Sequence, residues 1–184
     1  MTNQQDIELF TERAQAVSAV VERVPDMEAA LTYAVELAKS REPGVLAAPG
    51  WGQGERDRLT ELCGQAGVSL LTEGLRARAG DLGVGLTGVD WGAAATGTMV
   101  LDSNSEDLRL ASMLSEIHVA VLPAERIRPD LESLEDELSA LMARRPSYLA
   151  FITGASRTAD IELVLTIGAH GPVEVHVVIV GEPS

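Results

Sequence analysis

Residues 117–122 read IHVAVL, an apolar run that is interrupted by one histidine. Such a run is typical of a strand that is buried on both faces, as the strands of parallel sheets are. Because parallel strands need crossover connections, the alternation of such runs with helical patterns predicts a three-layer α/β fold, in which helices cover both faces of a mostly parallel sheet. Comparable runs recur along the chain at 44–48, 68–71, 98–101, 148–153 and 175–180.

The helical patterns are clearest near the N-terminus. Residues 4–40 predict two helices, because apolar side chains from Ile7 to Val21 recur at helical spacing and Pro25 suits the first turn of a second helix. Further helices are expected over the charged stretch 53–65 and over the acidic, amphipathic stretch 130–143.

A chain of 184 residues suits a single domain, since domains hold about 100–200 residues. We expect a helical N-terminal segment, 1–40, that packs on an α/β domain, 41–184. Two parts of that domain lack a regular pattern. Residues 80–102 are rich in glycine and are predicted to be irregular up to their final strand, and residues 161–168 suit either a helix or a strand.

The net charge of the chain is −14, from 28 acidic and 14 basic residues. A surface with this charge repels the phosphates of nucleic acids and of anionic lipids, so neither is expected as a partner. Lys39 is the only lysine, in a polar stretch typical of a helix end. P-loop proteins, Schiff-base enzymes and pyridoxal-phosphate enzymes need a lysine at the reacting centre, so these classes are not expected.

The single cysteine, Cys63, and the scattered histidines supply the ligand set of neither an iron–sulfur cluster nor a zinc site. We therefore expect no intrinsic redox cofactor and no metal. No stretch of the sequence reaches the ~20 apolar residues of a membrane helix, and the polar N-terminus lacks the apolar core of a signal peptide. The expected compartment is the cytoplasm.

Three stretches combine glycine with hydrogen-bonding side chains. The first extends from Thr87 to Thr98, where glycines let backbone N–H groups approach a ligand and threonine hydroxyls add neutral hydrogen bonds. It is either a loop that holds a phosphate or carboxylate, or a tight turn before a buried strand in which Asp90 and Thr96 cap backbone groups.

The second stretch, 153–162, leaves a predicted strand through Gly154 and carries hydroxyl, guanidinium and carboxylate groups. Ligands of open α/β sheets bind beyond the carboxyl ends of strands, so Ser156, Arg157 and Thr158 are placed to bind an anion. Alternatively, Arg157 pairs with an acidic neighbour inside this stretch and a hydroxyl caps a helix.

The third stretch, 168–172, is a turn that presents His170 before the last predicted strand. His170 suits a general acid–base or an anion ligand near neutral pH, or else it is a structural residue of a Gly-Pro turn. His118 and His176 alternate with strand residues and are predicted to be packing or surface positions.

With these residues in view, the sequence resembles the LUD (lactate-utilization) domain family over residues 83–181. The words TGT, SRTADIE and HGP carry much of the match. The resemblance implies the fold of the ribose-5-phosphate isomerase, glucosamine-6-phosphate deaminase and CoA-transferase group. It also implies a role in the oxidation of L-lactate to pyruvate beside separate iron–sulfur subunits. The matching segments are TGVDWGAAATGTMVLDS (87–103), RLASMLSEIHVAVLP (109–123) and ITGASRTADIELVLTIGAHGPVEVHVVIVG (152–181).

The resemblance further implies a set of site residues. The family usually has a glutamate directly before Thr-Gly-Thr, and Ala95 stands in that place here, so any chemistry of that carboxylate is missing from this chain. By residue type, catalytic roles are expected for His170, Asp160 and Glu162. Ligand-binding roles are expected for Asp90, Thr96, Gly97, Thr98, Arg109, Gly154, Ser156, Arg157, Thr158 and Gly171.

We expect a small anionic ligand to dock between residues 96–98 and residues 156–158, with Arg157 on its carboxylate or phosphate. The leading hypothesis is a non-redox subunit or accessory protein that associates with iron–sulfur subunits. The alternative is a free-standing enzyme or ligand-binding protein of the isomerase and CoA-transferase fold that acts on a sugar phosphate, a folate or an acyl-CoA. The first predicts stable association with the iron–sulfur proteins, and the second predicts turnover by the purified chain alone.

Overall fold

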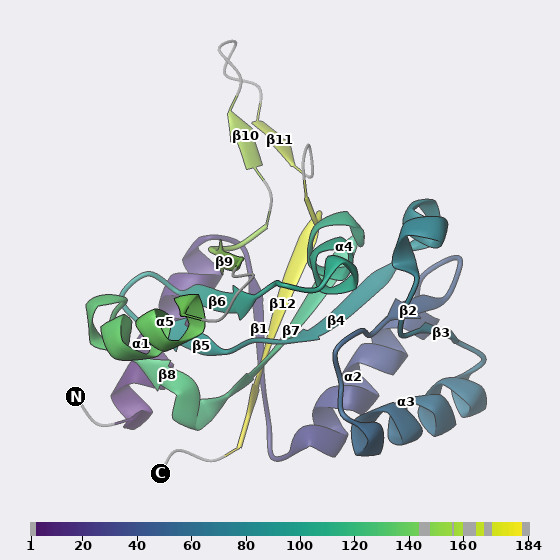
Figure 1. Cartoon of the computed structure of the whole chain (residues 1–184), viewed down its shortest axis with the longest axis horizontal. Helices are drawn as coiled ribbons and strands as arrows, with labels where there is room; N and C mark the ends of the chain where they lie inside the picture. Colours follow the sequence, from purple (N-terminus) through teal and green to yellow (C-terminus); the bar gives the residue numbers. More distant parts are fainter. Residues whose placement is uncertain (1–2, 144–147, 156, 160–164, 168–170, 182–184) are drawn as a thin grey trace.

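The computed structural model describes residues 3–143, 148–155, 157–159, 165–167 and 171–181. Within these residues, six parallel strands form the central sheet (Figure 1). The predicted α/β fold with a mostly parallel sheet is confirmed. The strand order across the sheet is β1 (Val20–Val24), β12 (Glu174–Val180), β7 (Ile117–Pro123), β4 (Val84–Gly88), β2 (Val45–Ala47) and β3 (Ser69–Leu71).

Helices lie on both faces of the central sheet. On one face, α2 (Met27–Lys39) and α3 (Gln53–Ala66) pack their apolar side chains against β2, β4 and β7. On the opposite face, α1 (Asn3–Ala16) and α4 (Glu106–Leu114) share the cover with a second, smaller sheet. The 3-10 turn η1 (Leu75–Asp81) contacts α4.

The second sheet has the strand order β8-β5-β6-β9, and β6 is antiparallel to both of its neighbours. The runs at 98–101 and 148–153 are therefore strands, as predicted, but they belong to this sheet and not to the parallel one. A separate antiparallel ribbon of β10 and β11 stands away from the body of the molecule (Figure 1). The bounds are β5 (Trp91–Ala93), β6 (Thr98–Asp102), β8 (Ile127–Arg128), β9 (Leu149–Ile152), β10 (Arg157–Ala159) and β11 (Leu165–Ile167).

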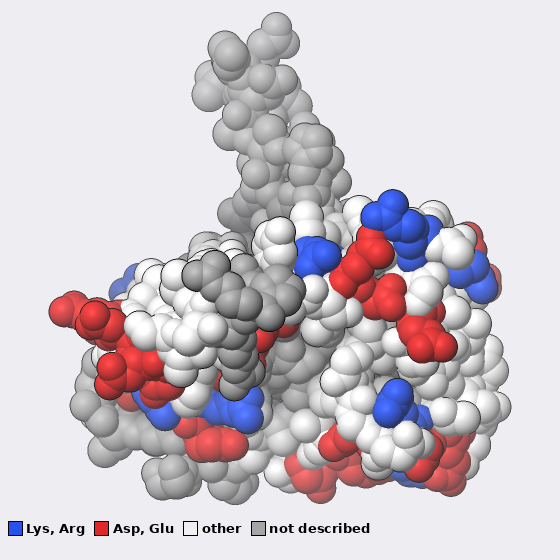
Figure 2. All heavy atoms as spheres, in the orientation of Figure 1, with Lys and Arg blue, Asp and Glu red and all other residues white. Residues whose placement is uncertain are grey.

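The acidic stretch 130–143 contains a shorter helix than predicted. The 3-10 turn η3 (Glu132–Leu134) leads into α5 (Glu135–Met142), and another such turn, η2 (Ala124–Arg126), follows β7. Leu134 is fully buried, whereas the acidic side chains of the first turn of α5 contribute to the red surface over this region in Figure 2.

The N-terminal segment contains a strand that the helical spacing concealed. α1 ends because Ser18 adopts a left-handed φ of 64° and the Ala19 N–H donates to the Ala14 carbonyl at 3.0 Å. Val20 and Val21 then begin β1, which pairs with β12, so their assignment to the first helix is wrong. Their β-branched side chains favour extended backbone where a sheet edge is there to pair with.

The start of the second helix also differs from the prediction. Asp26 is its N-cap, and Asp26 Oδ1 accepts the Ala29 N–H at 2.9 Å. Pro25 therefore precedes the cap and does not lie in the first turn. An aspartate in extended conformation satisfies an otherwise free N–H group of the first turn, which proline cannot do.

The glycine-rich stretch 80–102, predicted to be irregular, contains the central strand β4. Gly85 of β4 faces α4, and a Cβ built at this position would lie 2.1 Å from the Ala111 carbonyl oxygen and 2.5 Å from Ser115 Oγ. The backbone of α4 thus rests directly on β4. Glycine is required here because no side chain fits between the two backbones.

Gly85→Ala is expected to lower the free energy of unfolding by roughly 2–3 kcal/mol, because α4 must move off the sheet. Gly64→Ala is the matched control: Gly64 is an exposed helical glycine with open space around its Cβ position, so alanine should stabilise by up to ~1 kcal/mol. Urea denaturation of both variants measures the two signs. Equal effects would contradict the proposed contact.

A buried polar pair links β4 to β7 on the same face. The Thr87 Oγ1 and His118 Nε2 atoms are 2.8 Å apart, and both residues are fully buried. Burial lowers the pKa of His118 from its ordinary value to about 4, because the charged imidazolium loses its hydration. His118 is therefore neutral in the folded protein at physiological pH.

This lowered pKa predicts a loss of stability in acid. The unfolded chain takes up a proton on His118 near pH 6.5, whereas the folded chain does so only near pH 4, so the free energy of unfolding falls as pH drops through this window. His118→Gln, which stays neutral, should show a smaller decrease between pH 7 and pH 5 in urea denaturation. Parallel pH profiles for the two proteins would contradict the assignment.

Among the described residues, no helix is both long enough and apolar enough to cross a membrane.

Candidate functional site

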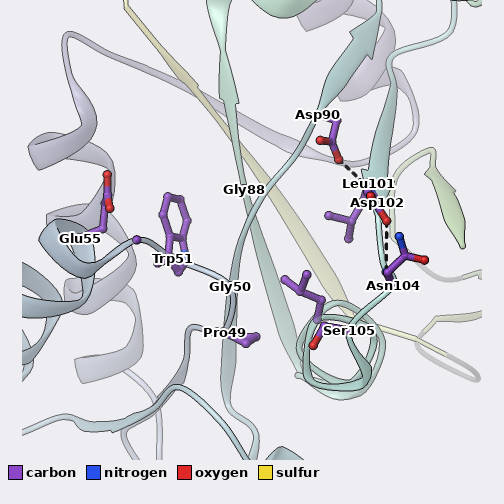
Figure 3. A pocket seen from close by; sticks show the side chains of 12 residues that line it. Pro49, Gly50, Trp51, Glu55, Gly88, Asp90, Leu101, Asp102, Asn104 and Ser105 are labelled. Carbon is purple, nitrogen blue, oxygen red and sulfur yellow. Dashed lines mark hydrogen bonds between the residues drawn. The ribbon is translucent and has the colours of Figure 1, made fainter. Parts of the chain in front are cut away.

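A cleft of about 670 Å³ opens at the carboxyl ends of β2 and β4 (Figure 3). The chain leaves β2 for β3 through α3 on one face, and it leaves β4 for β7 through α4 on the other face. Ligands of parallel α/β sheets bind at such a switch point, because the diverging connections leave a crevice. The lining residues are Pro49, Gly50, Trp51, Gly52, Glu55, Gly88, Asp90, Leu101, Asp102, Asn104, Ser105 and Leu108.

One wall of the cleft is the loop from β2 to α3. Gly50 has a φ of +82°, which favours glycine, and its Cβ position lies 3.1 Å from a methyl group of Leu108 across the cleft. Trp51 is held in place because its Nε1–H donates to the Leu86 carbonyl at 3.2 Å. α3 begins after Gly52, which lines the cleft, and no N-cap side chain binds the first N–H groups of this helix.

The opposite wall comes from the end of β6 and the start of α4. Asp90 Oδ2 accepts the Asp102 N–H at 2.7 Å, which fixes the Asp90 carboxylate against β6. Asn104 Oδ1 accepts the Tyr148 N–H at 2.8 Å, and its side-chain NH₂ has no partner among the described residues. Ser105, the N-cap of α4, makes no side-chain cap bond either. Figure 3 shows Asp90, Asn104 and Ser105 across the cleft from Trp51 and Glu55, with the Asn104 amide turned away from Trp51.

The cleft combines acceptors and donors of different kinds. Glu55, Asp90 and Asp102 contribute carboxylates, and the described lining contains neither lysine nor arginine. The N-termini of α3 and α4 contribute backbone N–H groups and the positive ends of two helix dipoles. This arrangement suits a ligand that bears hydroxyl groups for the carboxylates and one small anionic group for the helix N-termini.

Of the residues predicted from sequence, Asp90 lies in the cleft and Arg109 lies behind it. Arg109 Nη1 donates to the carbonyl oxygens of Ser103 at 2.6 Å and Asn104 at 3.0 Å. Its guanidinium also stacks over the Tyr148 ring, 5.2 Å from the ring centre. In this structure Arg109 holds the loop that presents Asn104 to the cleft.

The three residues 96–98 lie elsewhere. Thr96, Thr98 and Thr153 form a chain of hydroxyl groups, with oxygen–oxygen distances of 2.7 and 2.8 Å. Gly97, at a φ of +64°, packs against α1, where a Cβ would lie 2.4 Å from the Ala14 nitrogen. None of these residues lines the cleft, so the structure separates them from Asp90.

The remaining predicted residues belong to the other end of the domain or fall outside the described residues. Gly154 and Gly171 line a second, smaller cavity. The backbones of Arg157 and Thr158 lie in β10. Ser156, Asp160, Glu162 and His170 lie outside the described residues, and their roles stay predictions.

Sequence reasoning missed most of the cleft. Trp51, Glu55, Asp102, Asn104 and Ser105 had not been singled out. A signal was present at both walls: the glycine-flanked Trp51 follows an apolar strand and precedes a helix, and the run 102–105 is Asp-Ser-Asn-Ser at the junction of a strand and a helix. Both patterns are typical of loops that bind ligands at helix N-termini.

The fold and this cleft define the chain as a parallel α/β protein with a ligand-sized crevice at the switch point of its sheet. The family model of the LUD domain matches residues 7–180, so the chain belongs to the LUD domain family. The family resemblance found in the sequence is confirmed, and the match extends into the N-terminal region.

Similar proteins include "Lactate utilization protein C" of Halalkalibacterium halodurans, which is 35% identical over 133 residues, covering 71% of this chain and 51% of the relative. The protein of the same name from Bacillus subtilis is 34% identical over 102 residues, covering 54% and 42%. This chain spans about half the length of the curated relatives that it matches. A crystal structure of a DUF162 family protein from Deinococcus radiodurans shares the fold, with a TM-score of 0.70, 20% identity and coverage of 98% and 99%.

The Arg109 contacts yield a test of its role. Arg109→Ala should lower the free energy of unfolding by about 1–2 kcal/mol, because two charged hydrogen bonds to carbonyl oxygens and the stacking on Tyr148 are lost. The exposed Arg23 provides a matched control, and Arg23→Ala should change this free energy by less than about 0.5 kcal/mol. If the free energy of unfolding of Arg109→Ala equals that of Arg23→Ala, the result would instead favour a role of Arg109 that is confined to ligand binding.

Proposed function

We propose that this chain is a non-redox subunit or accessory protein in the oxidation of L-lactate to pyruvate, and that it acts in the cytoplasm. The observation that carries the proposal is the donor and acceptor pattern of the cleft in a member of the LUD domain family, whose relatives are called lactate utilization proteins.

The chemistry of the cleft supports a 2-hydroxy acid as ligand. A carboxylate accepts hydrogen bonds, and the N-termini of α3 and α4 together with the Asn104 NH₂ supply donors. A hydroxyl donates, and the carboxylates of Asp90 and Asp102 accept. Lactate has both groups on adjacent carbon atoms.

The cysteine content supports separate electron carriers. Cys63 is the only cysteine of the chain, and burial in the α3 core raises the pKa of its thiol to about 11. A protonated, buried thiol is a poor ligand and a poor nucleophile. We propose that iron–sulfur partner proteins carry the electrons.

The proposal predicts that purified iron–sulfur subunits of the same organism need this chain to reduce an artificial electron acceptor with L-lactate. Asp90→Asn should lower this rate by at least ~10-fold, because the amide keeps the acceptor for the Asp102 N–H but loses the charge that binds the hydroxyl. Glu135→Gln removes one charge from the exposed start of α5 and should have no effect.

Equal rates with and without the chain would contradict the proposal. Co-elution of Asp90→Asn with the subunits in gel filtration should be unchanged, which separates loss of the ligand from loss of the complex.

A second function is favoured by the size of the cleft. Sites for drug-sized ligands measure about 300–1,000 Å³, and the cleft, at about 670 Å³, is in this range. The half-buried face of Trp51 adds a flat apolar surface. A sugar phosphate, a folate or an acyl-CoA would fill the cleft. The chain would then be a free-standing enzyme or binding protein for one of these compounds. Turnover of one of these compounds by the purified chain alone would establish this alternative.

A further inference from the structure

A second cavity, of about 210 Å³, lies on the α4 face of the sheet near the beginning of β7 and β12. Ser112 and Met113 of α4 form one side, Ile152 of β9 forms another, and His118 lies at its buried floor. The cleft contacts the first residues of α4 and this cavity contacts the last, so the two sites lie at opposite ends of the same helix.

His118 brings an unused hydrogen-bonding atom to this cavity. Its neighbours in β7, Ile117 and Val119, point into the α2 and α3 core, so the His118 side chain lies on the opposite, cavity face. His118 Nε2 is 2.8 Å from Thr87 Oγ1, whereas the buried Nδ1 atom has no hydrogen-bond partner among the residues that the structure describes. A buried polar atom without a partner costs about 1–3 kcal/mol, so such atoms are rare unless something binds them.

The walls of the cavity are largely apolar. Met113, Ile152, Pro172 and Val175 line it, and Ser112 Oγ, which donates to the Arg109 carbonyl at 3.2 Å, is a polar atom beside them. A buried water needs about 2–4 polar partners, and the cavity is several times larger than one water molecule. Water alone therefore satisfies His118 poorly and leaves the apolar walls uncovered.

We propose that this cavity is a binding site for a small, uncharged, mostly apolar molecule that carries a hydroxyl group, and that the hydroxyl binds His118 Nδ1. A hydroxyl both donates and accepts, so it pairs with either tautomer of the imidazole. The described residues that line the cavity carry no full charge, so a carboxylate or ammonium group would find no countercharge among them. An apolar cavity of about 150 Å³ is known to hold benzene, so a single ring fits.

The rim of the cavity provides an apolar entrance. Met113 and Phe151 both line it and are 53% and 50% exposed, respectively, so two large apolar side chains stand beside the opening. Exposed apolar side chains beside a pocket are typical of ligand-binding surfaces. This site differs from the cleft, whose lining carries three carboxylates, and the proposal is independent of the role in lactate oxidation.

The test uses phenol as the probe and toluene as its counterpart without a hydroxyl. Isothermal titration of the intact protein should show that phenol binds at least ten times more tightly than toluene. In ¹⁵N-resolved NMR spectra of the histidine side chains, phenol should shift the Nδ1 resonance of His118 and leave that of His176 unchanged. His176 is the matched control, because its Nδ1 is already 2.7 Å from the Tyr33 hydroxyl.

Two variants separate the hydroxyl contact from the cavity itself. His118→Phe should lower the affinity for phenol about ten-fold to the level of toluene, and Ala150→Leu, which fills the cavity from β9, should abolish the binding of both compounds. Equal affinities of the unaltered protein for phenol and toluene would overturn the proposal, as would a His118 Nδ1 resonance that phenol does not shift. Undiminished phenol binding by Ala150→Leu would place the probe elsewhere and would also overturn it. If His118→Phe fails to fold, the phenol and toluene comparison and Ala150→Leu still decide.

Discussion

α4 lies directly on β4 because Gly85 has no side chain, and much of the functional geometry depends on this contact. A helix of nine residues is about 13 Å long. Its first turn contributes Ser105 and Leu108 to the cleft, and its last turn contributes Ser112 and Met113 to the second cavity. If a side chain stood at position 85, α4 would lie further from the sheet and both sets of residues would move. The missing Cβ of Gly85 therefore determines where the walls of both sites lie.

The charges of the cleft determine which ligands it accepts. Two helix N-termini contribute partial positive charges of about half an elementary charge each, which three carboxylates outweigh. An anion is therefore attracted only where it contacts the N–H groups directly. If such a ligand has no hydroxyl group, nothing offsets the repulsion between its negative charge and the carboxylates of Asp90 and Asp102. This charge pattern suits a molecule that has an acceptor and a donor close together. The role of Arg157 as the anion ligand stays a prediction, and its backbone lies in β10, which stands apart from the body (Figure 1).

The sequence predicted the layers of the fold better than the site. Runs such as 117–122 and 175–180 are buried strands because they lie in the middle of a covered sheet, and their composition alone indicates this. β4 escaped prediction because its position under α4 demands glycine, which sequence rules associate with turns. β1 escaped because valines at 20, 21 and 24 fit a helix and a strand equally, and only the edge of β12, more than 150 residues away, decides between them.

Asp90 was found from the sequence as a polar residue in a glycine-rich stretch. Trp51 and Asn104 were not, because their relation to Asp90 depends on three loops that meet only after folding.

The second sheet ties together two connections of the central sheet, and residues of both sites lie beside this tie. β5, β6 and α4 form the connection from β4 to β7, and β8 and β9 belong to the next connection, from β7 to β12. Pairing of β6 with β9 ties the two connections together, and the bonds of Asn104 and Ser103 to the Tyr148 backbone continue this pairing up to the cleft. Of the segments that resemble the LUD domain family, 87–103 contains β6, and 152–181 begins at Ile152, the last residue of β9. A substitution in β9 would reach the cleft through Tyr148 and the second cavity through Ala150 and Ile152, so this strand couples the geometry of the two sites.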